Sequence, residues 1–341
     1  MTMNIPPPWQ NPYLAGHDEA ARQFEAAYAA GRLPHAWLIA GIEGIGKATL
    51  AWHFAHYVMS GGANPIGKLN MQHPAARLIA AEAHPDLFVL QRPLDERTGA
   101  PKDGIPVEDA RKIAPFLHMT ASHGAWRVAI VDEAHALNRF GQNAILKVIE
   151  EPPEKCLILL TVTTPGVLLP TIRSRCRVLP LQPLDDAAMR AVLMRCGAET
   201  GDLGRVIALS SGSAGFALTM LQTESLPLYE EMLVLLQNLP ELDMASAHRL
   251  ADRVGRKTDR ERFAVLAHLL TEALRKAVRA QAAGEPLADG FTARLAQGNR
   301  LDRTLQLWEK IGQTFATTEA ASLDRKLAFL NALSEIRRMA A

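Results

Sequence analysis

The sequence predicts an α/β domain with a parallel sheet, followed by a region made only of helices. Short apolar runs typical of buried strands lie at 35–40, 86–90, 127–131 and 157–162, and helical segments separate them. Strands that alternate with helices indicate a parallel sheet covered on both faces, which binds ligands at the carboxyl ends of its strands.

Beyond residue 182 the apolar residues recur at helical spacing, and we expect no strand there. These apolar residues form three stripes, each suited to a bundle core or to contacts with other subunits. The stripes comprise Phe263, Leu266, Leu270 and Leu274; Leu301, Leu305, Trp308, Ile311 and Phe315; and Leu323, Leu327, Leu330 and Leu333. A break at 285–290 separates two of these helices. Polar, turn-rich composition predicts loops at 62–75 and 92–104.

Bulk composition excludes several classes of protein. With 341 residues the chain is too long for one core, and its net charge of +1 excludes a strongly basic nucleic-acid coat. Three widely spaced cysteines favour reduced thiols in a cytosol. We see no signal peptide, and no apolar run approaches the roughly 18 residues of a membrane span. The expected location is therefore cytoplasmic.

The segment at 41–50, GIEGIGKATL, is close to a phosphate-binding loop. Gly41, Gly46 and Lys47 match the G-x-x-x-x-G-K-[ST] spacing, with a further glycine at Gly44. Glycines allow backbone amides to cradle phosphate, and the lysine reaches the β- and γ-phosphates. At the position where the hydroxyl of a serine or threonine would bind Mg²⁺, this chain has Ala48. Thr49 follows, but one helical residue turns its side chain by about 100°.

An apolar strand that ends in Asp132-Glu133 follows about 85 residues later. In a P-loop ATPase the aspartate helps to hold Mg²⁺, and the glutamate can polarise the attacking water. A helix N-terminus made acidic to suit its dipole is the plainer interpretation. The letters DEAH at 132–135 also suggest a helicase, but the helical remainder does not supply a second RecA-like domain.

The stretch at 161–176 carries further candidates. Thr163 or Thr164, at a strand end, could sense a γ-phosphate, and Arg175 could reach a nucleotide held by a neighbouring subunit. A solvated arginine at a helix end is the alternative that spacing alone favours. Ser211 or Ser213 is expected to cap a helix.

These motifs together resemble the AAA+ clamp-loader family, over nearly the whole chain. The blocks that carry the resemblance are 35–51, 105–153 with its N-x-x-x-x-L-K-x-x-E-E-P-P pattern, and TIRSRCR at 171–177. The resemblance implies an AAA+ P-loop domain with a parallel sheet (1–182), a small helical lid (183–224) and an all-helical collar that oligomerises (225–341).

Two departures point to a stationary subunit of that family. Motor subunits carry an arginine after the Gly-Ser of the lid, whereas this lid reads Gly212-Ser213-Ala214-Gly215, and Ala48 lacks the hydroxyl. The resemblance implies a stator with little or no ATPase activity, with Arg175 as a finger in a neighbour's site. Because Lys47 and Glu133 are kept, an active clamp-loader ATPase stays an alternative; another AAA+ machine such as a helicase loader is a third.

The family also sets expectations for cofactors and partners. ATP or ADP binding is left open, with Mg²⁺ only alongside nucleotide, and no zinc is expected because 59–84 holds no cysteine. The implied partners are motor and delta subunits in a five-subunit ring, the sliding clamp and primer–template DNA, with no membrane.

Overall fold

The chain folds into two compact units, Met1–Gly215 and Phe216–Ala341. The structure, a computed structural model, describes residues 3–95, 99, 101–122, 126–199, 201–256, 259–286, 290–298 and 300–340. Most of the predicted lid lies in the first unit, with the sheet. The finer division at 182 and 224 stays a prediction.

The first unit is built on a five-stranded sheet in which every paired strand is parallel. Its strands are β1 (Ala36–Ala40), β2 (Leu87–Leu90), β3 (Arg127–Val131), β4 (Cys156–Val162) and β5 (Arg177–Pro180), in the order β2-β3-β4-β1-β5. The four predicted strands are confirmed. The sequence did not reveal β5, because it is short and only Leu179 in it is buried.

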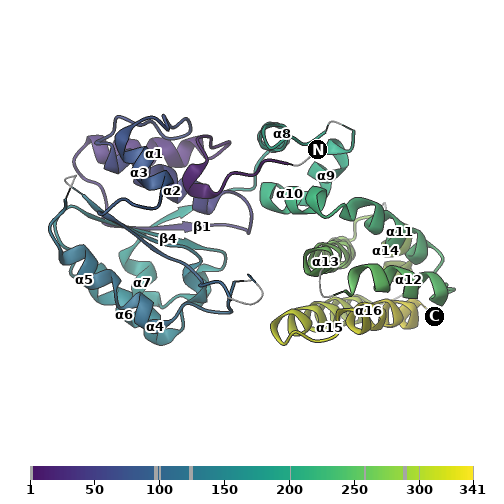
Figure 1. The fold of residues 1–341 in the computed structure, drawn as a ribbon. Coiled ribbons are helices and arrows are strands. Elements are labelled where there is room, and N and C mark those ends of the chain that lie inside the picture. Colours follow the sequence, from purple (N-terminus) through teal and green to yellow (C-terminus); the bar gives the residue numbers. More distant parts are fainter. Residues whose placement is uncertain are drawn as a thin grey trace. The chain divides into compact units, whose positions relative to one another are not determined.

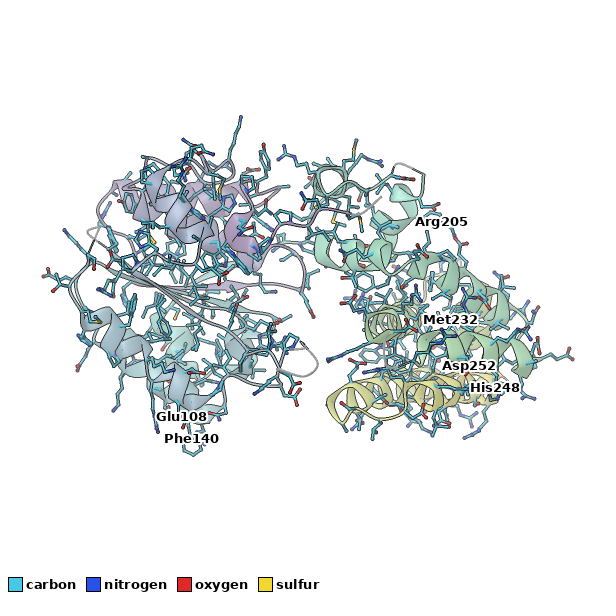
Figure 2. The ribbon with its side chains drawn as sticks, viewed as in Figure 1. Glu108, Phe140, Arg205, Met232, His248 and Asp252 are labelled. Carbon is cyan, nitrogen blue, oxygen red and sulfur yellow. The ribbon has the colours of Figure 1, made fainter. Side chains whose placement is uncertain are left out.

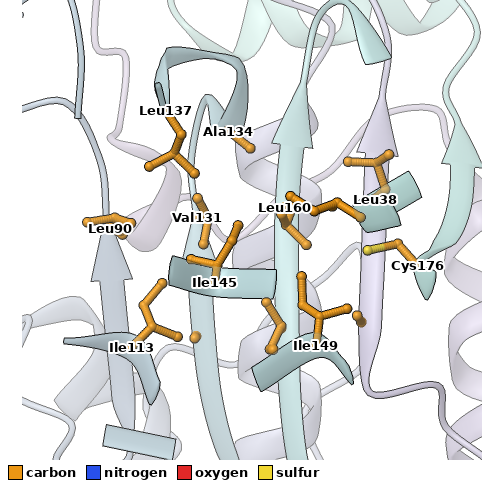
Figure 3. Packing of buried hydrophobic residues seen from close by; sticks show 14 of the residues in the cluster. Leu38, Leu90, Ile113, Val131, Ala134, Leu137, Ile145, Ile149, Leu160 and Cys176 are labelled. Carbon is orange, nitrogen blue, oxygen red and sulfur yellow. The ribbon is translucent and has the colours of Figure 1, made fainter. Parts of the chain in front are cut away.

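Helices cover both faces of this sheet, as predicted (Figure 1). On one face lie η1 (Pro8–Gln10), α1 (Asp18–Ala29), α2 (Lys47–Met59) and α3 (Pro74–Ala80); on the other lie α4 (Val107–Ala110), α5 (Ile113–His118), α6 (Arg139–Glu150) and α7 (Pro170–Arg175). Alternate residues of β4 point to opposite faces. Ile158 and Leu160 join the cluster under α4–α7 (Figure 3), while Leu157 and Leu159 join the cluster under α1–α3.

Helix α6 shows how the pattern of apolar residues fixes orientation. Ile145, Val148 and Ile149 are buried against the sheet. The opposite stripe is exposed and runs from Phe140, which is 72% exposed (Figure 2), to Glu150 in the last turn. Asn138 caps the helix by accepting a hydrogen bond from the Gly141 amide.

Three helices follow β5: α8 (Asp186–Arg195), α9 (Leu203–Ser210) and α10 (Ala214–Gln222), the last of which crosses into the second unit. The N-terminal segment packs against α8. The Asn4 amide donates to Cys196 O at 3.0 Å, and the Arg195 guanidinium lies 4.0 Å from the centre of the Tyr13 ring.

The described residues of the second unit form helices joined by turns and include no strand, as the sequence predicts. It comprises α11 (Ser225–Gln237), α12 (Met244–Val254), α13 (Arg260–Ala283), α14 (Gly290–Gly298), α15 (Leu301–Ala320) and α16 (Arg325–Ala340). Phe263, Phe315 and Phe329 pack in series in its core. The predicted stripes are not wholly buried: Leu323 is 52% and Leu327 57% exposed, and Leu301 and Leu305 are also exposed.

One predicted loop and the helix break include residues outside the described ones. Residues 96–98 and 100 of the loop at 92–104, and residues 287–289 of the break at 285–290, are outside. The described part of the former loop is closed by a bridge between Leu94 and Pro101. The segment 62–75 is mostly turns until α3 begins at Pro74. Across the part of the chain that the structure describes, no helix is both long and apolar enough to cross a membrane.

Two buried histidines on α2 fasten the N-terminal segment. His53 donates from Nε2 to Asn11 O at 3.1 Å and accepts the Gly67 amide at Nδ1 at 3.0 Å, so its ring is neutral. His56 Nε2 lies 3.4 Å from Trp9 O. Burial lowers the pKa of both rings to about 4.

The folded protein should therefore lose stability as the pH falls from about 6.5 towards about 4, because the unfolded chain gains protons on these rings first. We expect His53→Gln to flatten this dependence in chemical denaturation between pH 7 and 4. The control is His118→Gln on an exposed ring, which should leave the dependence as it is. Equal slopes for wild type and His53→Gln would contradict the assignment.

Candidate functional site

The glycine loop joins β1 to α2 at the carboxyl edge of the sheet. The Gly41 amide donates to Val162 O of β4 at 3.1 Å. Gly44 and Gly46 have φ of 75° and 101°, a region that favours glycine. A Cβ on Gly41 would lie 2.5 Å from the Ile45 side chain and 3.2 Å from Leu181 O, so this position also needs glycine. The loop is thus built as its sequence predicts.

All four carbonyl oxygens from Ile42 to Ile45 accept hydrogen bonds from the protein. The donors are Lys47 Nζ to Ile42 O (2.7 Å), Ser213 Oγ to Glu43 O (2.8 Å), the Gly215 amide to Gly44 O (2.8 Å) and His17 Nε2 to Ile45 O (2.7 Å). The loop is therefore held by three separate parts of the chain: its own helix, the start of α10 and the start of α1.

The lid contact depends on the absence of a side chain at Gly215. A Cβ there would lie 2.8 Å from Gly44 Cα. Ser213, which the sequence suggested as a helix cap, sits just before α10 and reaches back to the loop. His17 adopts a left-handed φ of 62°, and burial lowers the pKa of its ring, which favours the neutral form that donates to Ile45 O.

With its carbonyls turned to the protein, the loop leaves its amides available. Among the described residues, none of the backbone amides from Gly44 to Thr49 donates a hydrogen bond to another protein group. They sit at the N-terminus of the 13-residue helix α2, whose dipole favours an anion. Lys47 is 9% exposed; burial lowers the pKa of its ammonium, and Glu43, Asp132 and Glu133 oppose that effect. These groups fit a phosphate.

The same loop does not fit the usual Mg²⁺ contact. Ala48 has no hydroxyl, and Thr49 is the next residue round the helix. Among described residues, no group of three or more His, Cys, Asp or Glu could hold a metal. The expectation that the chain binds no zinc stays a prediction.

Asp132 directly follows β3 and is hydrogen-bonded to a residue of β4. Thr161 Oγ1 donates to Asp132 Oδ1 at 2.5 Å and accepts the Glu133 amide at 2.8 Å. Burial raises the pKa of Asp132, against the effect of the hydrogen bond from Thr161 and the charge of Lys47. Asp132 is therefore near enough to Lys47 for their charges to interact, and one of its oxygens is already engaged.

Glu133 is paired with an arginine that the sequence analysis missed. Arg92 Nε donates to Glu133 Oε2 at 2.5 Å, and the two side chains are 31% and 32% exposed. Arg92 follows β2, the neighbour of β3, so the carboxyl ends of these strands bring the two residues together. The glutamate expected to polarise water is thus neutralised by a cation.

The threonine that contacts the acidic pair is not one that we predicted. Thr161 is buried in β4, whereas Thr163 is half-buried and Thr164 is exposed just before η3 (Pro165–Val167). Thr161 shares its strand face with Leu157 and Leu159, the face covered by α2. A polar residue inside an apolar strand was the available signal. Roles for Thr163 and Thr164 stay predictions.

Arg175 lies at the edge of the sheet opposite the glycine loop. β1 and β5 are parallel, with Trp37 beside Arg177 at their amino ends and Ala40 beside Pro180 at their carboxyl ends. The loop follows Ala40, whereas Arg175 precedes Arg177. At least three strand residues, roughly 10 Å along the strand direction, therefore separate Arg175 from the loop. The side chain of Arg175 is 42% exposed, and its Nη2 lies 3.1 Å from Glu150 Oε1.

Comparison with known proteins gives the chain its family. Residues 16–185, about half of the chain, match the family model described as DNA polymerase III, delta subunit. The chain is 38% identical to the DNA polymerase III subunit delta' of Pseudomonas aeruginosa over 154 residues, which is 45% of this chain and 44% of that protein. The chain is 32% identical to the delta' subunit of Escherichia coli over 205 residues, which is 59% of this chain and 58% of that protein.

Other relatives belong to the same polymerase. The chain is 31% identical over 191 residues to the subunit gamma/tau of Mycobacterium tuberculosis, covering 55% of this chain and 31% of that protein. The match therefore spans between 31% and 58% of these three curated relatives' length.

Solved structures that match the chain have low sequence identity to it. A gamma subunit-related protein of Thermotoga maritima gives a TM-score of 0.46 at 17% identity, covering 94% of this chain and all of that one. The RuvB Holliday junction branch migration motor of the same organism gives 0.42 at 18%, covering 89% and 90%. From its family match and its delta' relatives, the chain is a delta-prime-like member of the DNA polymerase III clamp-loader subunits.

Proposed function

We propose that this chain is the stationary subunit of a clamp loader and supplies Arg175 to the ATP site of a neighbouring subunit. The observation that carries the proposal is the topology of β1 and β5, which separates Arg175 from the chain's own loop by the length of the strands. A guanidinium helps phosphoryl transfer when it meets the charge that develops on phosphate. Exposed at the far edge, Arg175 suits a nucleotide held by another subunit.

The chain's own site supports phosphate binding better than hydrolysis. The free amides of the loop and Lys47 suit ATP or ADP, while Ala48 removes one Mg²⁺ ligand. The ion pair between Arg92 and Glu133 competes with any water for that carboxylate. We therefore assign the loop a nucleotide-holding role, with Mg²⁺ entering only alongside nucleotide.

Partners follow from the same family. We infer that the chain joins motor and delta subunits in a five-subunit ring that acts on the sliding clamp and primer–template DNA in the cytoplasm. The helical unit supports a collar role because exposed leucines lie on α15, on α16 and between them: Leu301, Leu305, Leu323 and Leu327. An active ATPase is the second candidate, favoured by the retention of Lys47, Asp132 and Glu133.

The isolated chain should hydrolyse ATP negligibly in a steady-state assay, because its metal contact is incomplete and Glu133 is paired. Turnover on the order of 1–100 s⁻¹, as in competent phosphoryl-transfer enzymes, would favour the active ATPase. In that case the Lys47→Ala variant is the control: loss of the ATP turnover in this variant would show that the activity belongs to this chain and not to a contaminating ATPase.

In the assembled clamp loader, Arg175→Ala should leave assembly intact and lower clamp loading by about tenfold or more, since fingers of this kind contribute roughly 10³–10⁵ in rate. Arg175→Lys should restore only part, because an ammonium lacks the planar fork. Arg173→Ala, on the same helix and also exposed, is the matched control and should load normally. Wild-type loading by the Arg175→Ala complex would refute the finger.

A further inference from the structure

The structure assigns Glu150 as the positioning residue of Arg175, a role that rests on the function proposed above. Glu150 does not touch nucleotide in this assignment. It acts through the guanidinium, by holding it in one orientation at the surface so that its remaining donors are ready for a phosphate.

Two contacts hold the guanidinium of Arg175. Its Nη2 lies 3.1 Å from Glu150 Oε1, and its Nη1 donates to Thr171 O of its own helix at 3.3 Å. An arginine has five N–H donors in a planar fork. One of the five donates to Thr171 O, and Nη2 faces the Glu150 carboxylate. The side chain keeps 42% of its surface exposed, so other donors remain accessible.

Both members of the pair stand on fixed backbone. Ile149 precedes Glu150 and Cys176 follows Arg175, and these two neighbours are buried in one hydrophobic cluster (Figure 3). His35 Nε2 donates to Ile149 O at 2.9 Å, which anchors the end of α6 to the residue before β1. The pair is therefore not two mobile surface side chains that meet by chance; its two Cα positions are set by the core.

The pairing is selective among similar neighbours. Arg173, Arg175 and Arg177 are all exposed, yet among the described residues only Arg175 of the three forms an ion pair. On the acidic side, Glu150 and Glu151 are adjacent and exposed, and only Glu150 has an arginine partner within the described chain. One acid and one base out of five candidates are brought together.

The expected effect is modest, because the pair is partly exposed. Holding a long side chain in one geometry saves conformational entropy when phosphate binds, but water and salt weaken an exposed pair. A loss of about two- to fivefold is the scale that such a pair supports. The loss should be larger at low ionic strength than at high, because salt screens an exposed pair.

The test is a double-mutant cycle in the assembled clamp loader, read as clamp-loading rate. Glu150→Ala should lower the rate by about two- to fivefold, and the double variant Glu150→Ala/Arg175→Ala should load no more slowly than Arg175→Ala alone. Glu151→Ala is the matched control and should leave the rate unchanged. In the isolated chain, the NMR order parameter of Arg175 Nε should fall in Glu150→Ala but not in Glu151→Ala.

Each other outcome overturns a defined part of the account. If Arg175→Ala slows loading while Glu150→Ala does not, the positioning role is wrong and the finger stands. If the effects of Glu150→Ala and Arg175→Ala add, Glu150 acts elsewhere and the inference fails. If Arg175→Ala has no effect, both the finger and the inference fail, even where the order parameter falls as expected.

Discussion

The fixed direction of four consecutive carbonyls, from Ile42 to Ile45, towards donors of the protein is the constraint on which the first unit depends. The donors come from positions as far apart in sequence as His17, Lys47 and Ser213. Turning the carbonyls towards the protein leaves the amides of the loop and of α2 facing the other way, where an anion can be bound. The same bonds tie the start of α1 and the lid to the sheet. The same hydrogen bonds therefore shape the phosphate site and help to hold the unit together.

Around that loop, the groups needed for hydrolysis are either bonded to other residues or missing. Thr161 donates a hydrogen bond to Asp132, Arg92 forms an ion pair with Glu133, and Ala48 has no hydroxyl. At the opposite edge of the sheet, the exposed Arg175 is held by Glu150 and Thr171. The two edges therefore differ in chemistry: one is suited to hold phosphate, and the other presents a cation outward. This separation is what a subunit needs if it assists a neighbour's reaction without running its own.

Sequence reasoning found the four longer strands and the glycine loop because strand burial and loop spacing are local. It missed β5, whose residues are mostly exposed, and it missed the contacts that define the site. Arg92 and Glu133 are 41 residues apart, Asp132 and Thr161 are 29 apart, and Ser213 and Glu43 are 170 apart. Such pairs depend on strand order, which a single sequence does not state. The predicted sensor threonines, Thr163 and Thr164, follow β4 two and three residues beyond Thr161, the side chain that reaches Asp132.

The measurement that tests the account most directly is the affinity of the isolated chain for ATP, titrated by calorimetry with Mg²⁺ and with a chelator. A loop that holds phosphate without its metal ligand should bind ATP with affinities that agree within about twofold in the two conditions. Ala48→Thr, which restores a hydroxyl at the metal position, should make binding depend on Mg²⁺. A gain of about tenfold or more from Mg²⁺ in the wild-type chain, or no binding in either condition, would contradict the account.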